Sequence, residues 1–241
     1  GRVRVLWAFI CTVLWTIVFG LSGIFLTTFE SNKGRTLGHC ARLWGKFILF
    51  TCGIKYKVTG LNNLNPNANY IFAGNHTSML DIPIAFSGLP YWLVPIAKIE
   101  LRSVILLGWV MRTARHIFID RKKSENAIRI LEKTKKSLLD NPRSILLFPE
   151  GTRTQDGSIG PFKKGGLLLS LDTKMPIVPI AFIGSFEMFG KGSWSMKGRS
   201  VELRVGTPIE PSNYSYETRK ELAEHVREKV SDLMQAFYKL N

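Results

Sequence analysis

The stretch that decides the fold runs from residue 70 to residue 86 and reads YIFAGNHTSMLDIPIAF. Its first four residues are apolar and predict a strand, 70–73. After a glycine and a polar turn, residues 78–86 have the pattern of a helix. A buried strand that passes directly into a helix is the repeating unit of α/β proteins.

Short apolar runs alternate with helical segments through residues 55–241. Strands are predicted at 55–59, 70–73, 92–96, 116–119, 144–148, 177–182 and 201–205. Helices are predicted at 78–86, 103–111, 124–139, 162–172 and 216–240. Near-continuous apolar strands separated by helices predict an α/β fold with a mostly buried, mixed sheet flanked by helices. We expect residues 55–241 to form one α/β domain.

Residues 1–54 have a different character. No charged side chain occurs from residue 5 to residue 29, a stretch of 25 residues. At about 1.5 Å per residue, a helix of this length reaches across about 30 Å of hydrocarbon. A signal peptide is the competing interpretation, but the stretch is long and no small-residue cleavage site follows it convincingly. Arg2 and Arg4 precede it, and Lys33 and Arg35 follow it, so the flanking charges indicate no orientation.

A second apolar stretch, 37–54, is amphipathic, with Arg42 and Lys46 four residues apart on one face. Two helices joined near residues 32–34 would enter one leaflet and return, leaving every charge on the cytoplasmic side. This arrangement satisfies the charges better than a single span does. The sequence therefore predicts an N-terminal two-helix membrane-embedded hairpin (1–54) at the cytoplasmic face of the cell inner membrane.

The charge balance points to a polyanionic partner. The chain has 33 basic and 18 acidic residues, a net charge of +15, and the excess lies in residues 1–54 and 97–143. Aromatic residues are not interleaved with the basic band as single-strand nucleic-acid platforms require, which favours anionic membrane lipids over nucleic acid. A non-catalytic lipid-binding protein remains an alternative at this point. The three cysteines lack metal-ligand spacing, and no metal site is predicted.

The first candidate site follows the predicted strand 70–73. His76 lies where α/β proteins place their sites, and Asp81 comes five residues later. The turn between them can fold the carboxylate back onto one imidazole nitrogen. The other nitrogen would then be free to accept a proton from a substrate hydroxyl. The alternative is a surface histidine followed by an aspartate that caps a helix.

The second candidate is the sequence FPEGTR, residues 148–153, at the end of another predicted strand. Gly151 permits a tight turn, so Glu150 and Arg153 project from one short loop. Arg153 is suited to clamp a phosphate, and Glu150 to hold that guanidinium or to accept a substrate hydroxyl. A surface ion pair in a turn is the alternative.

Two further cations follow predicted strands. Arg121 ends the run IFIDR, residues 117–121, and is a candidate second phosphate ligand that Asp120 would orient. Lys98 is a weaker candidate of the same kind. A serine-hydrolase elbow, a P-loop, a zinc-protease motif and a dinucleotide fingerprint are all absent from the sequence.

The blocks N-H-x4-D, F-I-D-R, F-P-E-G-T-R and V-P-I, in this order between residues 70 and 182, resemble the glycerolipid acyltransferase family, and within it the bacterial 1-acylglycerol-3-phosphate acyltransferases. The resemblance implies transfer of a fatty acyl group from an acyl thioester to the sn-2 hydroxyl of lysophosphatidate, which yields phosphatidate. The implied catalytic residues are His76 and Asp81. The positions implied to serve or complete the glycerophosphate site are Arg121, Glu150, Gly151, Thr152 and Arg153.

With the residues in these roles, His76 would act as general base without a covalent acyl-enzyme, which agrees with the missing serine elbow. No cofactor is expected beyond the co-substrate, acyl-CoA or acyl carrier protein. The expected partners are this donor, lysophosphatidate and membrane lipids. The oligomeric state is left open, as is acylation of glycerol-3-phosphate or another lysophospholipid instead.

Overall fold

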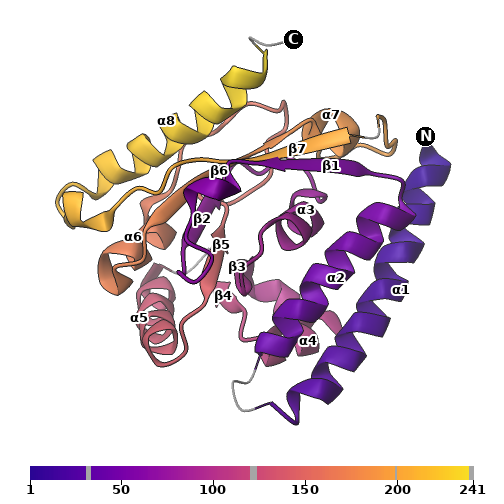
Figure 1. Cartoon of the computed structure of the whole chain (residues 1–241), viewed down its shortest axis with the longest axis horizontal. Helices are drawn as coiled ribbons and strands as arrows, with labels where there is room; N and C mark the ends of the chain where they lie inside the picture. The colour runs from indigo at the N-terminus through magenta and orange to yellow at the C-terminus, as the bar shows by residue number, and fades with distance from the viewer. Residues whose placement is uncertain (31–33, 120–123, 199, 239–241) are drawn as a thin grey trace.

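The computed structural model describes residues 1–30, 34–119, 124–198 and 200–238, and its centre is a seven-stranded sheet (Figure 1). The strand order is β1-β7-β6-β2-β5-β3-β4. Among the described strand pairs β6–β7 is antiparallel and the others are parallel, so the sheet is mixed, as predicted. The strands are β1 (Lys55–Thr59), β2 (Ile71–Gly74), β3 (Leu93–Lys98), β4 (Ile117–Ile119), β5 (Ser144–Leu147), β6 (Ile177–Ile183) and β7 (Ser200–Val205).

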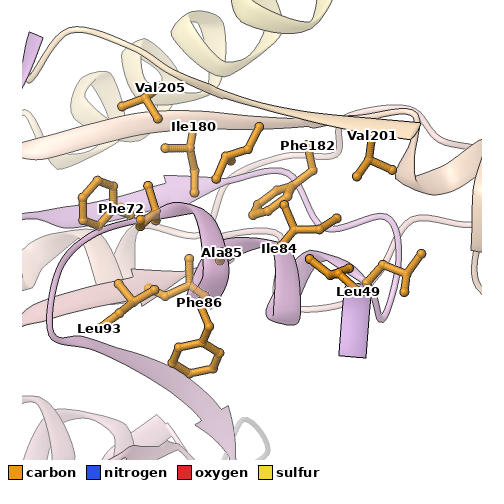
Figure 2. Packing of buried hydrophobic residues seen from close by; sticks show 14 of the residues in the cluster. Leu49, Phe72, Ile84, Ala85, Phe86, Leu93, Ile180, Phe182, Val201 and Val205 are labelled. Carbon is orange, nitrogen blue, oxygen red and sulfur yellow. The ribbon is translucent and has the colours of Figure 1, made fainter. Parts of the chain in front are cut away.

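Helices cover both faces of the sheet. They are α3 (Asp81–Gly88), α4 (Leu107–Thr113), α5 (Ser124–Asp140), α6 (Lys164–Thr173), α7 (Ser185–Phe189) and α8 (Arg219–Tyr238), with short 3₁₀ turns η1 (Leu61–Asn63), η2 (Ile99–Ser103) and η3 (Pro211–Asn213). Alternate residues of β2 enter different cores: Phe72 packs with Ile84 and Phe182 under α3 (Figure 2), and Ile71 packs with side chains of α6 and α8. Burial on both faces explains why the strands read as continuous apolar runs.

Three helices differ from the sequence-based prediction. The helix predicted at 78–86 begins at Asp81, because the amide of Ser78 donates to the Asp81 carboxylate. The helix predicted at 103–111 begins later, as α4 at Leu107, and is preceded by a turn at residues 104–106. Helix α7 was not predicted, since five residues are too few for a helical period to show.

The N-terminal helices α1 (Arg2–Thr27) and α2 (Arg35–Thr51) run side by side along the edge of the α/β fold (Figure 1). This confirms the two-helix hairpin, and α1 is long and apolar enough to cross a membrane. Helix α2 lies between α1 and α3. A Cβ atom on Gly45 would meet the Pro83 carbonyl oxygen at 2.6 Å, so the backbones of α2 and α3 are in close contact. Residues 32 and 33, where the helix connection was placed, lie outside the described residues.

Candidate active site

His76 and Asp81 form a hydrogen-bonded pair at the end of β2. The Nδ1 atom of His76 lies 2.9 Å from Oδ2 of Asp81. That oxygen also accepts hydrogen bonds from the backbone N–H groups of Thr77 (2.8 Å) and Ser78 (2.9 Å). Because the oxygen is an acceptor toward all of them, Nδ1 carries a proton and Nε2 presents its lone pair. The structure thus brings these two predicted residues together.

The Asp81 carboxylate is fully buried, and both of its oxygens accept hydrogen bonds. Its second oxygen, Oδ1, accepts a bond of 2.7 Å from the hydroxyl of Ser185, the first residue of α7. A buried carboxylate without such donors would be costly to keep in the fold. Asp81 is therefore held by α7 as well as by its own turn, and its position relative to the imidazole is rigid.

The His76 ring is packed on one side and open at one edge. It stacks on Phe148, with ring centroids 4.0 Å apart and planes inclined by 19°. The side chain remains 19% exposed, and Nε2 has no hydrogen-bond partner within the described part of the chain. A ring with a fixed tautomer and an accessible lone pair is equipped to take a proton from an incoming hydroxyl.

Glu150 joins the two loops that carry the site. Its Oε1 accepts the backbone N–H of His76 at 2.8 Å, and its Oε2 accepts the backbone N–H of Gly160 at 3.0 Å. Burial raises the pKa of this carboxyl above its ordinary value, and the two N–H donors partly offset the effect. Among the described residues no ion pair joins Glu150 to Arg153, so this carboxylate does not hold that guanidinium, contrary to one expectation.

The rest of the FPEGTR loop forms a turn beside His76. Gly151 has φ +78°, a conformation that suits glycine, and its N–H donates to the Phe148 carbonyl at 3.0 Å. Thr152 is exposed and Arg153 is half-buried. The Thr154 N–H donates to the His76 carbonyl at 2.9 Å, so the residue that follows Arg153 is bonded directly to the backbone of His76.

The remaining predicted ligands follow other strands of the same sheet. Lys98 is exposed at the end of β3. Since β2, β5 and β3 are adjacent and parallel, Lys98 shares the carboxyl edge of the sheet with His76 and the FPEGTR loop, without a described contact to either. Arg121, with Asp120, lies outside the described residues.

Sequence reasoning missed two residues that shape the site. The Asn75 side chain binds both backbone groups of Phe182 on β6, at 2.8 and 3.0 Å, and so anchors the residue before His76. Ser185 follows the end of β6, which pairs in parallel with β2. A serine just past a predicted strand was the available signal, but only the strand order shows that it faces Asp81.

Comparisons with known proteins assign the chain to a family. Residues 55–183 match the family model described as acyltransferase. The chain is 33% identical over 186 residues to human 1-acyl-sn-glycerol-3-phosphate acyltransferase alpha, which covers 77% of this chain and 66% of the human protein. It is 32% identical over 218 residues to 1-acyl-sn-glycerol-3-phosphate acyltransferase of Saccharomyces cerevisiae, covering 90% of this chain and 72% of that protein.

A solved structure extends the similarity to the whole fold. The crystal structure of the 1-acyl-sn-glycerophosphate (LPA) acyltransferase PlsC from Thermotoga maritima superimposes with a TM-score of 0.80 at 25% identity, covering 96% of this chain and 95% of that chain. The chain belongs to the acyltransferase family. The relatives named above are all acyltransferases of 1-acylglycerol-3-phosphate, and the chain spans just under two thirds of the human relative.

Proposed function

We propose that this chain transfers a fatty acyl group from an acyl thioester to the sn-2 hydroxyl of 1-acylglycerol-3-phosphate, forming phosphatidate. The observation that carries the proposal is the His76–Asp81 pair at 2.9 Å, with Nε2 of the ring accessible. The names of the relatives and of the solved neighbour support the choice of acceptor.

In the proposed reaction His76 acts as general base. Its Nε2 removes the proton of the acceptor hydroxyl as the hydroxyl oxygen attacks the thioester carbonyl carbon. The buried Asp81 carboxylate stabilises the imidazolium that forms. When the carbon–sulfur bond breaks, the thiolate leaves and takes the proton back from His76. The acyl group passes directly from the donor sulfur to the acceptor oxygen, so no covalent acyl-enzyme forms. Acyl-CoA or acyl carrier protein suffices as co-substrate.

The acceptor phosphate is proposed to bind beside the FPEGTR loop. Within the described residues the Arg153 guanidinium has no carboxylate partner, which leaves it available for a bidentate phosphate contact. Arg121 and Lys98 are proposed as further cations for this phosphate, and Gly151 and Thr152 shape its loop. Glu150 already binds two backbone amides, so its proposed share in the acceptor site is chiefly to hold the loop in place.

The chain is proposed to bind the cytoplasmic face of the inner membrane. Contacts of α1 favour a helix that lies along one leaflet over a helix that crosses the membrane. The amino terminus donates to the Met196 carbonyl at 3.3 Å, and Arg4 donates to the Gly198 carbonyl at 2.8 Å. Farther along α1, a Cβ atom on Gly20 would meet Val110 of α4 at 2.7 Å. A helix attached to the α/β fold at both places cannot stand perpendicular to a bilayer that the fold only touches.

Thiol release from an acyl thioester tests the function. Purified chain in detergent is given acyl-CoA or acyl carrier protein with lysophosphatidate, with glycerol-3-phosphate, or with no acceptor. We expect thiol and phosphatidate in equal amounts with lysophosphatidate, and no thiol burst without an acceptor. Loss of the general base in His76→Ala should lower turnover by about 10²–10⁴-fold, and circular dichroism should show the fold retained.

Three outcomes would contradict parts of this proposal. Full activity of His76→Ala would show that His76 is not the general base. A preference for glycerol-3-phosphate would show that lysophosphatidate is not the acceptor. A thiol burst with donor alone, accompanied by acylated protein, would show that transfer passes through a covalent acyl-enzyme and is not direct.

The Arg153 role has its own test. Arg153→Ala should raise KM for lysophosphatidate and change kcat little, because a phosphate clamp contributes binding energy away from the reacting carbonyl. A charge-conserving Arg153→Lys variant should recover only part of the affinity, since an ammonium cannot bind two oxygens in parallel. A drop in kcat with unchanged KM would contradict the clamp.

A further inference from the structure

An apolar segment, residues 104–109, projects from the α/β fold. It comprises the turn between η2 and α4 together with the first three residues of α4, and we call it the 104–109 loop. Its outward side chains are Val104, Ile105 and Trp109, which are 45%, 95% and 59% exposed. An exposed leucine or isoleucine by itself is ordinary, but three large apolar side chains on one short loop form a patch. Water is a poor environment for such a patch.

The backbone of this loop is strained in a way that displays the patch. Leu106 has φ +63° and ψ −58°, and the Leu107 N–H donates to the Ile105 carbonyl at 2.8 Å. These values describe a γ-turn of the rare, strained kind. A leucine pays steric strain in this conformation, and the turn points its neighbour Ile105 almost entirely into solvent. Strain that exposes an apolar side chain favours a role for that side chain outside the fold.

The patch continues the apolar surface of α1. Helix α4 packs against α1, where Gly20 lies next to Val110. On the same part of α1, Ile17 and Leu21 are 42% and 50% exposed. The loop therefore extends the surface that we assign to the membrane, from the N-terminal hairpin onto the catalytic fold itself.

The charges around the loop suit an anionic lipid surface. Between residues 97 and 119 the basic residues outnumber the one acidic residue, Glu100. The basic residues are Lys98, Arg102, Arg112 and Arg115. Apolar side chains flanked by exposed cations are the pattern of segments that insert at the boundary between headgroups and acyl chains.

We propose that the 104–109 loop is a second membrane contact, which inserts Val104, Ile105 and Trp109 into an anionic phospholipid leaflet. The loop begins one 3₁₀ turn after β3, whose carboxyl end lies on the same sheet edge as His76. Insertion here holds the catalytic edge at headgroup level, where a one-tailed acceptor presents its hydroxyl. The inference rests on the proposed membrane location and is independent of which acyl transfer the site performs.

An environment-sensitive fluorophore tests the insertion. Ile105→Cys is labelled with a nitrobenzoxadiazole maleimide in the full chain, and the matched control is Leu139→Cys, which replaces a 59% exposed leucine on α5. The native cysteines are buried, and the unlabelled parent chain serves as blank. In vesicles of phosphatidylglycerol and phosphatidylcholine, the probe at 105 should shift to the blue and be quenched by doxyl-labelled lipid. The probe at 139 should do neither.

Two results would overturn the proposal. One is equal, water-like emission at 105 and 139. The other is a blue shift at 105 that grows with protein concentration and is unaffected by the lipid quencher, which would assign the patch to self-association of the chain. Neither readout needs enzymatic activity, so a failure of the proposed acyl transfer leaves this test intact.

A kinetic arm connects the contact to catalysis. Ile105→Asp should lower turnover of lysophosphatidate presented in anionic vesicles by about tenfold, since a carboxylate at this depth opposes insertion. Turnover of the same acceptor in detergent micelles should equal that of the parent chain. An equal loss in both media would overturn the membrane role and assign the effect to the fold.

Discussion

The Asp81 carboxylate receives donors from three parts of the chain: the His76 ring, the backbone that follows it, and the Ser185 hydroxyl. Its two oxygens differ in their task, because Oδ2 binds the imidazole and the turn, whereas Oδ1 binds α7. The Ser185 hydroxyl is also within 2.7 Å of the Thr77 hydroxyl. At this scale, we infer that Ser185 is a positioning residue that acts on His76 through Asp81.

Ser185→Ala should therefore change the pH profile as well as the rate. With one donor removed, the Asp81 charge is less compensated and holds the imidazolium more strongly, so the acid limb of the kcat profile should move to higher pH. We expect kcat to fall by about tenfold, or about 1.4 kcal/mol. Ser78→Ala is the matched control, because the hydrogen bonds of the Ser78 hydroxyl to described residues join it to the backbone of Leu80 and Phe189 and not to Asp81. An unmoved acid limb in Ser185→Ala would leave Ser185 a purely structural role.

Glu150 makes the stability of the fold depend on pH. Burial raises the pKa of its carboxyl, so the folded state holds this proton more tightly than the unfolded chain does. The resulting stabilisation is present below the unfolded pKa, about 4.3, and is lost as pH rises through the folded pKa. In thermal unfolding, the wild-type chain should lose stability relative to Glu150→Gln as pH rises from that value. A constant difference between the two proteins at every pH would contradict this linkage.

At the scale of the elements, the close backbone contact between α2 and α3 bears on the site. Gly45 of α2 faces the Pro83 carbonyl, and Asp81 is the first residue of α3. Any displacement of α3 moves the carboxylate that holds His76. The hairpin and the α/β fold also share one core: Leu49 of α2 lies beside Ile84 of α3, and both belong to the same buried cluster as Phe72 of β2 (Figure 2). The division of the chain into a segment 1–54 and a domain 55–241 remains a prediction. Side chains of both parts pack in one core.

Gly45→Ala tests this contact. The added methyl group would lie 2.6 Å from backbone that cannot easily give way, and overpacking of this kind costs about 1–3 kcal/mol. We expect a lower unfolding temperature in detergent together with a lower kcat. Gly165→Ala in α6 is the control, because a Cβ there meets nothing within 4 Å, and it should be neutral or slightly stabilising. Equal behaviour of the two variants would show that α2 does not constrain α3.

At the scale of the whole molecule, we propose that the exposed apolar side chains of α1 and of the 104–109 loop contact the same anionic leaflet, to which the net charge of +15 attracts the chain. A chain bound in this way keeps both ends of α1 on the side of the membrane that carries the α/β fold. A spanning helix would place its two ends on opposite sides.

Cysteine labelling in sealed, inverted membrane vesicles distinguishes the two arrangements. Arg2→Cys lies at the start of α1, Arg35→Cys follows α1 at the start of α2, and Trp194→Cys, 77% exposed, reports on the α/β fold. A membrane-impermeant maleimide should label all three from the outside of these vesicles, whereas the buried native cysteines should not react. Protection of either Arg2→Cys or Arg35→Cys until the vesicles are opened would establish a span and contradict the one-leaflet arrangement.

The strands, the two-helix hairpin and the pairing of His76 with Asp81 were all predictable, because each depends on residues close together in the chain. Apolar runs identify buried strands, and a five-residue turn is short enough for its geometry to follow from spacing. The helix that begins at Asp81 was predicted to begin at residue 78. The sequence does not reveal that the Ser78 amide binds a carboxylate instead of continuing a helix.

The sequence by itself determined the chemistry available to this protein: an imidazole beside a carboxylate, a loop with a guanidinium, and an apolar N-terminus. Only the tertiary structure decided how that chemistry is held. Ser185 reaches Asp81 from 104 residues away, and Glu150 binds the His76 amide from 74 residues away. Such contacts depend on the order of the strands, which places β6 and β5 on either side of β2. No local pattern of residues encodes that order, because it follows from how all the apolar faces pack at once.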